Sequence, residues 1–342
     1  MQCSIIVPTY NRAEYLKKCV DALLNLDCGN DFKYNLTPAL TSKGMEIFCI
    51  DYEIIIVDDN STDGTREYLS GLANKKIRIL HNERNLGPAI SRNRGVENAS
   101  YDIVAFIDDD CVADKNWLRE LAGGFGSSGV RREDSGILHP PSAWVQNDAF
   151  FRNEDVDFVF GRTYYIEKEH KGYFPERLVN VKNWPGAGNM AFKKKIFNKL
   201  GGFDNNFYYY HNEDSELAIR AVENNFTFKY IDDAIVYHQA MNWNVKSLLA
   251  SARNASVWVK LKNKYPKSYR ILKPPVFGGF VVNGIDYFYI LFLPVLLPIL
   301  FIRYLLNGKR DIKMFFTKWP FYLFLRRYYI YNEAIKNRIF ML

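Results

Sequence analysis

The chain has 342 residues, of which 48% are hydrophobic and 16% aromatic, which excludes a disordered chain and leaves room for one large domain or two ordinary ones. The net charge of +7 is unevenly distributed: residues 1–239 carry 28 Lys and Arg against 35 Asp and Glu, or −7, whereas residues 240–342 carry 17 against 3, or +14. The basic end predicts an anionic partner. Five cysteines, an odd number with no C-x-x-C pair, argue against a zinc finger and against a disulfide framework.

Strand and helix patterns alternate from the first residue. Apolar runs predict four buried strands, at residues 3–7, 53–57, 77–80 and 103–107. A helical spacing of apolar residues follows the first strand over Ala13–Leu26, and Pro88 suits the first turn of a helix that extends to Ala99. This alternation predicts a mostly parallel sheet flanked by helices. Residues 27–51 and 126–152 are rich in turn-forming residues and are predicted to lie outside the core.

Polar clusters follow three of the predicted strands, at residues 8–12, 58–63 and 108–110. Because ligands of parallel sheets bind at the carboxyl ends of strands, we expect the three clusters to converge on one edge. Asp108, Asp109 and Asp110 form an acidic turn, which favours a cation, and hard divalent ions combine carboxylates with substrate phosphates. The turn therefore predicts a metal–diphosphate site. A solvated loop before a helix at Trp117 is the alternative.

Four motifs occur in order over residues 4–110, and dinucleotide-type G-x-G-x-x-G and P-loop motifs are absent from the sequence. They are Ser4-Ile-Ile-Val-Pro-Thr-Tyr-Asn-Arg12, Ile56-Val-Asp-Asp-Asn-Ser-Thr-Asp-Gly-Thr65, Asn85-Leu-Gly87 with Arg92-Asn-Arg-Gly95, and the acidic turn. Together they resemble a family 2 glycosyltransferase of the GT-A fold. The resemblance implies a Rossmann-like α/β fold and an inverting transferase. It also implies a nucleotide diphosphate sugar as donor, most commonly a UDP-sugar, with Mn²⁺ or Mg²⁺ as cofactor.

The resemblance also implies roles for residues at matching positions. Thr9 and either Asp58 or Asp59 would hold the nucleobase and ribose. Asp110 would bind the metal, and Asp108 would bind the metal or lie nearer the ribose and sugar. The other positions expected near the donor are Pro8, Asn11, Arg12, Asn85, Asn93, Arg94 and Asp109. Turn geometry is the competing explanation for Pro8, Gly87 and Gly95.

The second half of the predicted catalytic region begins with a strand at residues 157–166. Residues 183–193 resemble the family's segment that lines the sugar and acceptor pocket, and there Trp184, Gly188 and Asn189 are the candidate contacts. Trp184 would stack on a sugar, although buried packing explains a tryptophan equally well.

Glu213-Asp214 opens a predicted helix, and the resemblance implies that Asp214 is the general base, with Glu213 as the fallback. Capping of that helix by Asn212 or Asp214 is the structural alternative. A strand predicted at residues 234–238 ends in His238. This histidine would either be a further ligand of the metal or have a purely structural role. As a ligand, imidazole suits Mn²⁺ better than Mg²⁺. Gln239 and Trp243 have the spacing of the Q-x-x-R-W motif of processive synthases, but Asn242 replaces the arginine. This difference favours an enzyme that transfers a single sugar rather than one that builds a polymer.

The predicted division is a GT-A domain at 1–242, with a nucleotide-binding half at 1–112 and an acceptor half at 155–242, and a helical region at 243–342. In the last region, Lys and Arg alternate with aromatic residues, a pattern that suits an anionic membrane surface rather than nucleic acid. The apolar segment 285–306 contains two prolines and would span, re-enter or lie on the bilayer. Without a signal peptide pattern, a cytoplasmic protein held at the inner face of the membrane is expected, near a glycan or polyprenyl-linked acceptor.

Two other functions are compatible with an α/β sheet of this kind. A sugar nucleotidyltransferase should have a glycine-rich first loop with a basic residue, which this sequence lacks. An inactive membrane-bound scaffold would have no need of the set Asp108, Asp110 and Asp214. The donor sugar, the acceptor and the oligomeric state stay open.

Overall fold

The computed structural model describes residues 1–29, 50–125, 156–165, 185–210, 212–239, 245–266, 298, 301–302 and 319–338. The strands are β1 Gln2–Thr9, β2 Asp51–Asp58, β3 Ile77–His81, β4 Ile103–Phe106, β5 Cys111–Ala113, β6 Phe158–Tyr165, β7 Met190–Lys193 and β8 Phe228–His238. The helices are α1 Ala13–Leu24, α3 Thr65–Ser70, α4 Pro88–Glu97, α5 Trp117–Gly123, α7 Lys194–Leu200, the 3₁₀ helix η2 Asn205–Tyr210, α8 Glu213–Glu223, α9 Val245–Asn254, α10 Val257–Lys264 and α15 Trp319–Lys336.

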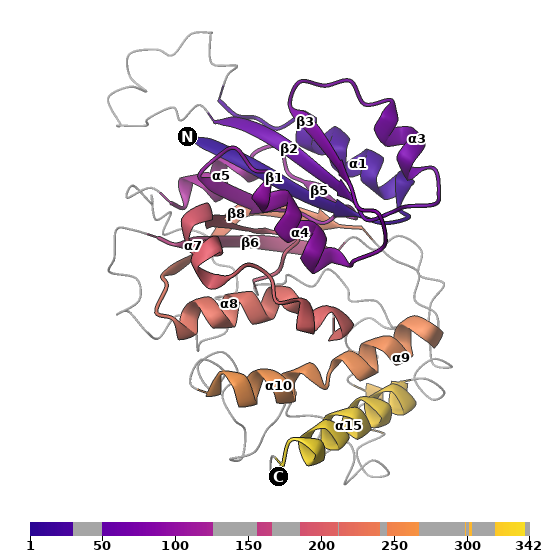
Figure 1. The fold of residues 1–342 in the computed structure, drawn as a ribbon. Coiled ribbons are helices and arrows are strands. Elements are labelled where there is room, and N and C mark those ends of the chain that lie inside the picture. The colour runs from indigo at the N-terminus through magenta and orange to yellow at the C-terminus, as the bar shows by residue number, and fades with distance from the viewer. Residues whose placement is uncertain are drawn as a thin grey trace.

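The strands form one eight-stranded sheet in the order β3-β2-β1-β4-β7-β6-β8-β5 (Figure 1). The four strands of the first half run parallel, as predicted. β7 is antiparallel to both β4 and β6 and so joins the two halves of the sheet. In the register of the first half, Thr9 is opposite Asp58, and Asp58 is opposite His81. The ends of β1, β2 and β3 therefore meet at one edge.

Three strands differ from the sequence prediction. β5 and β7 were not predicted, because three and four residues are too few to show a period. β8 begins at Phe228 rather than at residue 234, and its pairing with β6 shifts register between Gly161 and Arg162. The exposed acids Asp232 and Asp233 lie at this irregularity and interrupt the apolar pattern of the strand.

Helices cover both faces of the sheet. Alternating residues of β1 divide between two apolar clusters, since Ile5 packs with α1, α3 and α5 while Ile6 packs with α4, α7 and α8. Gly95 lies within α4 and against β1, where an added Cβ would be 2.5 Å from Cγ2 of Ile6. Close packing of helix on sheet, rather than a turn, is therefore the reason for a glycine there. At Gly87, by contrast, φ is 87°, so turn geometry is confirmed.

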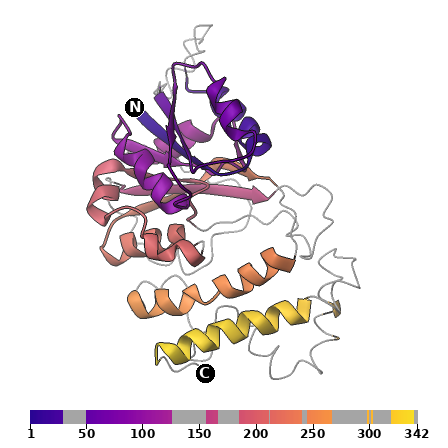
Figure 2. The same ribbon diagram turned by 45° about the vertical axis from the view of Figure 1, so that its right-hand side comes forward.

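The C-terminal helices form a further layer beyond α8 (Figures 1 and 2). Residues of α10 and α15 share an apolar cluster with Phe207 of η2 and Ile219 of α8. Lys264 and the hydroxyl of Tyr265 both bond to Glu216 of α8, whose side chain is fully buried. The described residues beyond 242 are thus attached to α8 and η2 by buried apolar and polar contacts.

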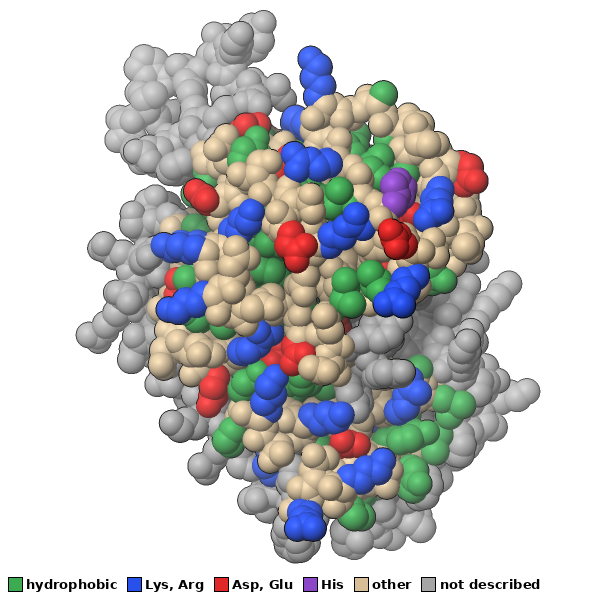
Figure 3. Space-filling view, in the orientation of Figure 1, with side chains coloured by type: hydrophobic (Ala, Val, Ile, Leu, Met, Phe, Trp, Pro, Cys, Tyr) green, Lys and Arg blue, Asp and Glu red, His purple; other side chains and the backbone are tan. Residues whose placement is uncertain are grey.

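Hydrophobic side chains lie beside Lys and Arg over these helices (Figure 3). Leu249, Tyr328 and Ile335 are among the exposed large hydrophobic residues. None of the helices in the described ranges is long and apolar enough to cross a membrane. Trp184, Asn242, Trp243, most of the predicted insertions and most of segment 285–306 lie outside the described residues.

Candidate active site

The acidic turn joins β4 to β5 and meets the loop that follows β1. Thr9 Oγ1 donates a hydrogen bond of 2.8 Å to Asp109 Oδ2. Arg12 Nη1 lies 2.9 Å from Asp109 Oδ1 and 2.8 Å from Asp110 Oδ2. Asp109 is thereby enclosed, and its burial, reinforced by the charge of Asp110, raises its pKa to about 6 against the opposing effect of Arg12. Two of the predicted clusters are in direct contact.

Asp110 and His238 form the candidate metal pair. β5 and β8 place Cys111 opposite His238, and His238 Nε2 lies 3.5 Å from Asp110 Oδ1. His238 Nδ1 lies 2.9 Å from the carbonyl oxygen of Gln239, which can only accept, so Nδ1 carries the proton. In a neutral imidazole, Nε2 then presents a lone pair to a carboxylate oxygen. Two electron-pair donors that face one another suit a shared divalent cation, so these residues fit the predicted metal.

Arg92 joins the two halves of the site. From α4, its Nη2 contacts Asp108 Oδ1 at 2.5 Å and its Nη1 contacts Glu213 Oε1 at 2.7 Å. The guanidinium is buried, and it holds the pKa of Asp108 below its usual value although burial opposes this. The pKa of Glu213 is raised by burial and by Asp214. One buried cation therefore fixes the acidic turn against the start of α8.

Arg92 was not among the predicted site residues. The sequence could have indicated it, because Arg92 is three residues after Ala89 and four before Val96, and this spacing puts all three on the buried face of α4. Its neighbours point elsewhere. Arg94 Nη1 contacts Asn82 Oδ1 at 2.6 Å, and the Asn93 side chain bonds to the backbone N–H and carbonyl of Phe203. The rotation of α4 about its axis thus directs Arg92, and not Arg94, toward Asp108 and Glu213.

Asp58 and Asp59 lie at the end of β2, at the edge where β1, β2 and β3 meet, and they have different hydrogen-bonding partners. Asp58 Oδ2 lies 3.0 Å from Arg66 Nε and 3.1 Å from His81 Nδ1, and its pKa is lowered by hydrogen bonds despite burial. Asp59 accepts the backbone N–H groups of Leu86 and Gly87 and also the amide of Asn82. Asp59 therefore shapes the loop that carries the exposed Asn85. Asp58 is held by the exposed side chains of Arg66 and His81 and by the backbone N–H of Ser61.

Asn11 connects the first two clusters. Its φ of 52° is in the left-handed region, and its Oδ1 accepts the backbone N–H of Thr62 at 2.7 Å. Pro8 still belongs to β1, which continues to Thr9 along β2 after its ladder with β4 has ended. These two residues thus position the loop.

α8 presents Glu213 and Asp214 at its first turn, and Asn212 before it makes no side-chain capping bond. Asp214 is half-buried and accepts the Ala187 N–H through Oδ2 at 3.3 Å. Gly188 follows, and an added Cβ there would be 3.1 Å from Asp108 Oδ2. The loop before β7 therefore lies between the candidate base and the acidic turn, and Gly188 permits the close approach.

Asn189 is held in the core. Its Oδ1 accepts Trp117 Nε1 at 2.9 Å, and its Nδ2 donates to the carbonyls of Arg162 and Ala234, both at 2.9 Å. These bonds join β7 to α5, β6 and β8 and satisfy the buried amide. Gly188, the preceding residue, approaches Asp108, whereas the side chain of Asn189 is engaged in these hydrogen bonds within the fold.

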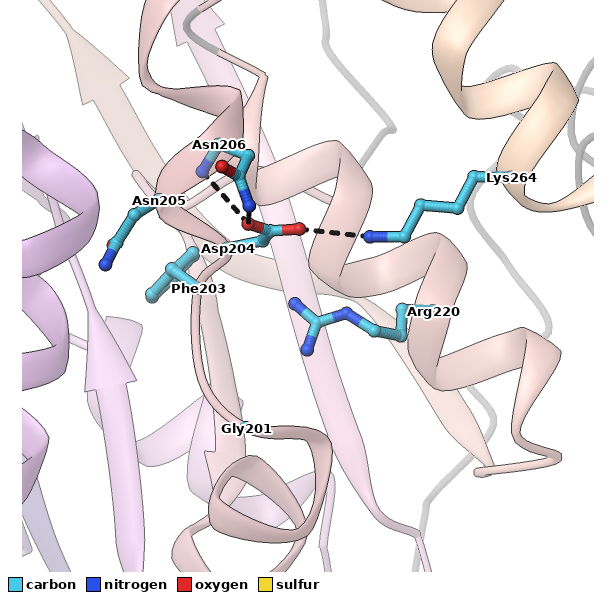
Figure 4. A pocket seen from close by; sticks show the side chains of 7 residues that line it. All are labelled: Gly201, Phe203, Asp204, Asn205, Asn206, Arg220 and Lys264. Atoms are coloured by element: carbon cyan, nitrogen blue, oxygen red, sulfur yellow. Dashed lines mark hydrogen bonds and ion pairs between the residues drawn. The ribbon is translucent and has the colours of Figure 1, made fainter.

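A pocket of about 310 Å³ lies apart from the acidic turn, between η2, α8 and α10 (Figure 4). Lys264 Nζ contacts Asp204 Oδ2 at 3.0 Å, and Arg220 Nη2 contacts Glu216 Oε2 at 2.7 Å. The guanidinium of Arg220 also donates to the carbonyls of Leu200 and Gly202. Both cations are paired, so these contacts serve to hold the helices together.

The fold is that of a GT-A protein, and comparison with known proteins shows that it is a glycosyltransferase. Residues 4–130 match glycosyl transferase family 2, and residues 178–241 match the N-terminal domain of galactosyltransferase. A glycosyltransferase assigned to teichuronic acid biosynthesis in Bacillus subtilis, TuaG, is 32% identical over 214 residues, which cover 58% of this chain and 74% of the relative. The chain belongs to glycosyltransferase family 2, and the resemblance drawn from its motifs is confirmed.

Two further relatives and one solved structure also resemble the chain. The glucosyl-dolichyl phosphate glucuronosyltransferase of Haloferax volcanii is 27% identical over 209 residues, 60% of this chain and 57% of the relative. The chain spans 39% of the length of an Escherichia coli chondroitin synthase, so it matches only part of several relatives. The mannosyltransferase PcManGT of Pyrobaculum calidifontis, solved with GDP-Man and Mn²⁺, has a TM-score of 0.54 at 15% identity, covering 96% of this chain and 86% of that chain. This likeness confirms the fold.

Proposed function

We propose that this protein transfers a sugar, with inversion, from a nucleotide diphosphate sugar to a hydroxyl of a glycan or lipid-linked acceptor. The observation that carries the proposal is the Arg92 bridge, because it places the start of α8 beside the acidic turn. Relatives include one named for a dolichyl phosphate substrate and a Campylobacter jejuni glucosyltransferase named for an undecaprenol-linked glycan. A UDP-sugar is the first donor to test.

Donor binding falls to the residues of the shared edge. Asp58 is the candidate for the nucleobase, since Arg66 and His81 hold its carboxylate at the end of β2. Asp110 Oδ1 and His238 Nε2 would hold Mn²⁺ or Mg²⁺, with Asp108 nearer the sugar. The bound ion supplies positive charge that stabilises the leaving diphosphate, so no general acid is needed.

Asp214 is the preferred base of the two acids at the start of α8. Its carboxylate is half-buried, and the positive end of the helix stabilises its charge. Glu213 is buried and paired with Arg92, and this ion pair favours a structural role for Glu213. Asp214 would accept the proton of the acceptor hydroxyl as that oxygen attacks the anomeric carbon from the face opposite the diphosphate.

The test is release of nucleoside diphosphate from a panel of nucleotide sugars with Mn²⁺ or Mg²⁺. Asp214→Asn should lower kcat about 10²- to 10⁴-fold and leave donor binding intact. Glu213→Gln serves as the matched change one residue away, and Asp110→Asn should weaken metal-dependent donor binding. Wild-type kcat in Asp214→Asn would remove the base assignment. No turnover of any donor, with nucleotide binding unaffected in Asp110→Asn, would refute the transferase proposal.

Membrane attachment of residues 243–342 is part of the same proposal, because the charge of +14 there favours anionic lipid and would bring Asp214 near a lipid-linked acceptor. The full chain should sediment with anionic vesicles but not with neutral ones. A truncation near residue 275 should bind them more weakly. Equal recovery of both forms in the supernatant would contradict it.

A further inference from the structure

Three side chains of different chemistry converge at the end of the acidic turn. Cys111 Sγ lies 3.8 Å from Asp110 Oδ1, and His238 Nε2 lies 3.5 Å from the same oxygen. The three potential ligand atoms lie within 4.8 Å of one another. The backbone enforces this arrangement, because Cys111 and His238 are cross-strand partners of β5 and β8 and so share a face of the sheet.

The spacing of the three atoms favours a small coordination number. Ligands about 2.2 Å from a tetrahedral ion are roughly 3.6 Å apart, whereas neighbouring oxygens of an octahedral Mg²⁺ at about 2.1 Å are roughly 3.0 Å apart. The two separations from Asp110 Oδ1, 3.5 and 3.8 Å, are nearer the tetrahedral value, and all three atoms lie within 4.8 Å of one another. Arg12 occupies the other oxygen of Asp110 at 2.8 Å, and this leaves Oδ1 for His238 and Cys111.

We propose that Asp110, Cys111 and His238 form a binding site for a borderline-soft divalent ion, Zn²⁺ or Co²⁺, through one oxygen, one sulfur and one nitrogen. Such mixed donor sets hold these ions in preference to Mg²⁺ or Mn²⁺. The thiol proton leaves to solvent as the metal–sulfur bond forms, and the carboxylate and thiolate together neutralise the divalent charge. Because the bound ion uses Asp110 Oδ1, it excludes the catalytic ion, a consequence that rests on the proposed function.

Cobalt reports the sulfur ligand directly. Titration of the full chain with Co²⁺, without donor or acceptor, should produce the visible bands of a tetrahedral ion and a near-ultraviolet sulfur-to-cobalt charge-transfer band. Cys111→Ser should lose the charge-transfer band, and His238→Ala should lose the tetrahedral spectrum. Cys28→Ser, a matched change of another buried cysteine, should retain both. A wild-type protein without the band, or a band that survives in Cys111→Ser, overturns the proposal.

Cys19 is the alternative sulfur, since its Sγ lies 3.6 Å from the backbone oxygen of Asp108. Loss of the band in Cys19→Ser, with Cys111→Ser unaffected, would also overturn the proposal. Circular dichroism and urea unfolding identify any variant that fails to fold, and calorimetry gives a second measure on the folded ones. There Cys111→Ser should weaken Zn²⁺ binding by roughly 100-fold and Mn²⁺ binding by less than about threefold.

These measurements separate the metal site from the transferase proposal. Neither the spectrum nor the calorimetry needs turnover, so an active enzyme without a cobalt–sulfur band overturns the metal site alone. A protein that binds Co²⁺ through Cys111 but turns over no donor supports the site even as the transferase proposal fails. Inhibition by Zn²⁺ that excess Mn²⁺ relieves supports both.

Discussion

Replacement of Arg92 by methionine should destabilise the protein far more than loss of a surface ion pair. Arg92 is 4% exposed and bonds to two carboxylates, of which the Glu213 side chain is 6% exposed and that of Asp108 is 29% exposed. Removal of one partner from a buried ion pair costs about 3–5 kcal/mol, because the remaining charge is left without compensation. Most of the loss should come from Glu213, since water partly solvates Asp108.

The loss should also depend on pH, because Arg92 opposes the effect of burial on the pKa values of both acids. Without it, both folded-state pKa values rise. A raised folded pKa gives stability that is present below the unfolded pKa, 3.8 for Asp and 4.5 for Glu, and lost as pH rises through the folded pKa. The deficit of Arg92→Met should therefore be largest near neutral pH and shrink toward about pH 5.

Urea unfolding, followed by circular dichroism at the two pH values, measures this deficit in the free energy of unfolding. Lys17→Met is the matched control, because the pair of Lys17 with Glu14 is largely exposed and contributes about 0–1 kcal/mol. Arg92→Lys should recover part of the loss, since an ammonium keeps the charge but lacks the fork that bridges two acids. A deficit no larger than that of Lys17→Met, or one that does not change with pH, would refute the reasoning.

Two further predictions concern stability. Asp109 has a folded pKa of about 6 against an ordinary value of 3.8, so its contribution is most favourable below about pH 4 and is lost as pH rises through about 6. Asp109→Asn should therefore gain stability relative to wild type between about pH 5 and pH 7.5, and urea unfolding that shows no such gain would count against a buried, titrating Asp109. Gly95→Ala should cost about 1–3 kcal/mol, because the new methyl overlaps Ile6 in the contact between helix and sheet; an unchanged thermal midpoint would contradict that packing.

Much of the first half of the fold was predictable because its signals are local. The runs at 3–7, 53–57 and 103–107 are buried strands, and the rule that parallel strands end together brought Thr9 and the acidic turn to one edge. β5 and β7 were not predictable in this way, because such short strands acquire their identity from their partners. The joining of the two halves of the sheet was therefore missed.

The candidate site was predictable in its acids but not in its cation. The motif supplied Arg92, Asn93 and Arg94 together, and sequence reasoning assigned the donor edge to the second and third. The rotation of α4 explains why Arg92 meets the acids, since residues three and four apart share a face and Arg92 lies on the buried one. A buried arginine that compensates distant acids has no local signature beyond that spacing.

Glu216 has a practical consequence for any shortened form of the protein. Its carboxylate accepts bonds from Lys264 and Tyr265, both located after residue 242, and Ile219 on the same helix packs against α10. A protein cut at 242 would expose this apolar surface to water and leave Glu216 with Arg220 as its remaining described cation. A shortened form intended for crystals or assays should therefore extend past Tyr265, so that α8 keeps its contacts with α10.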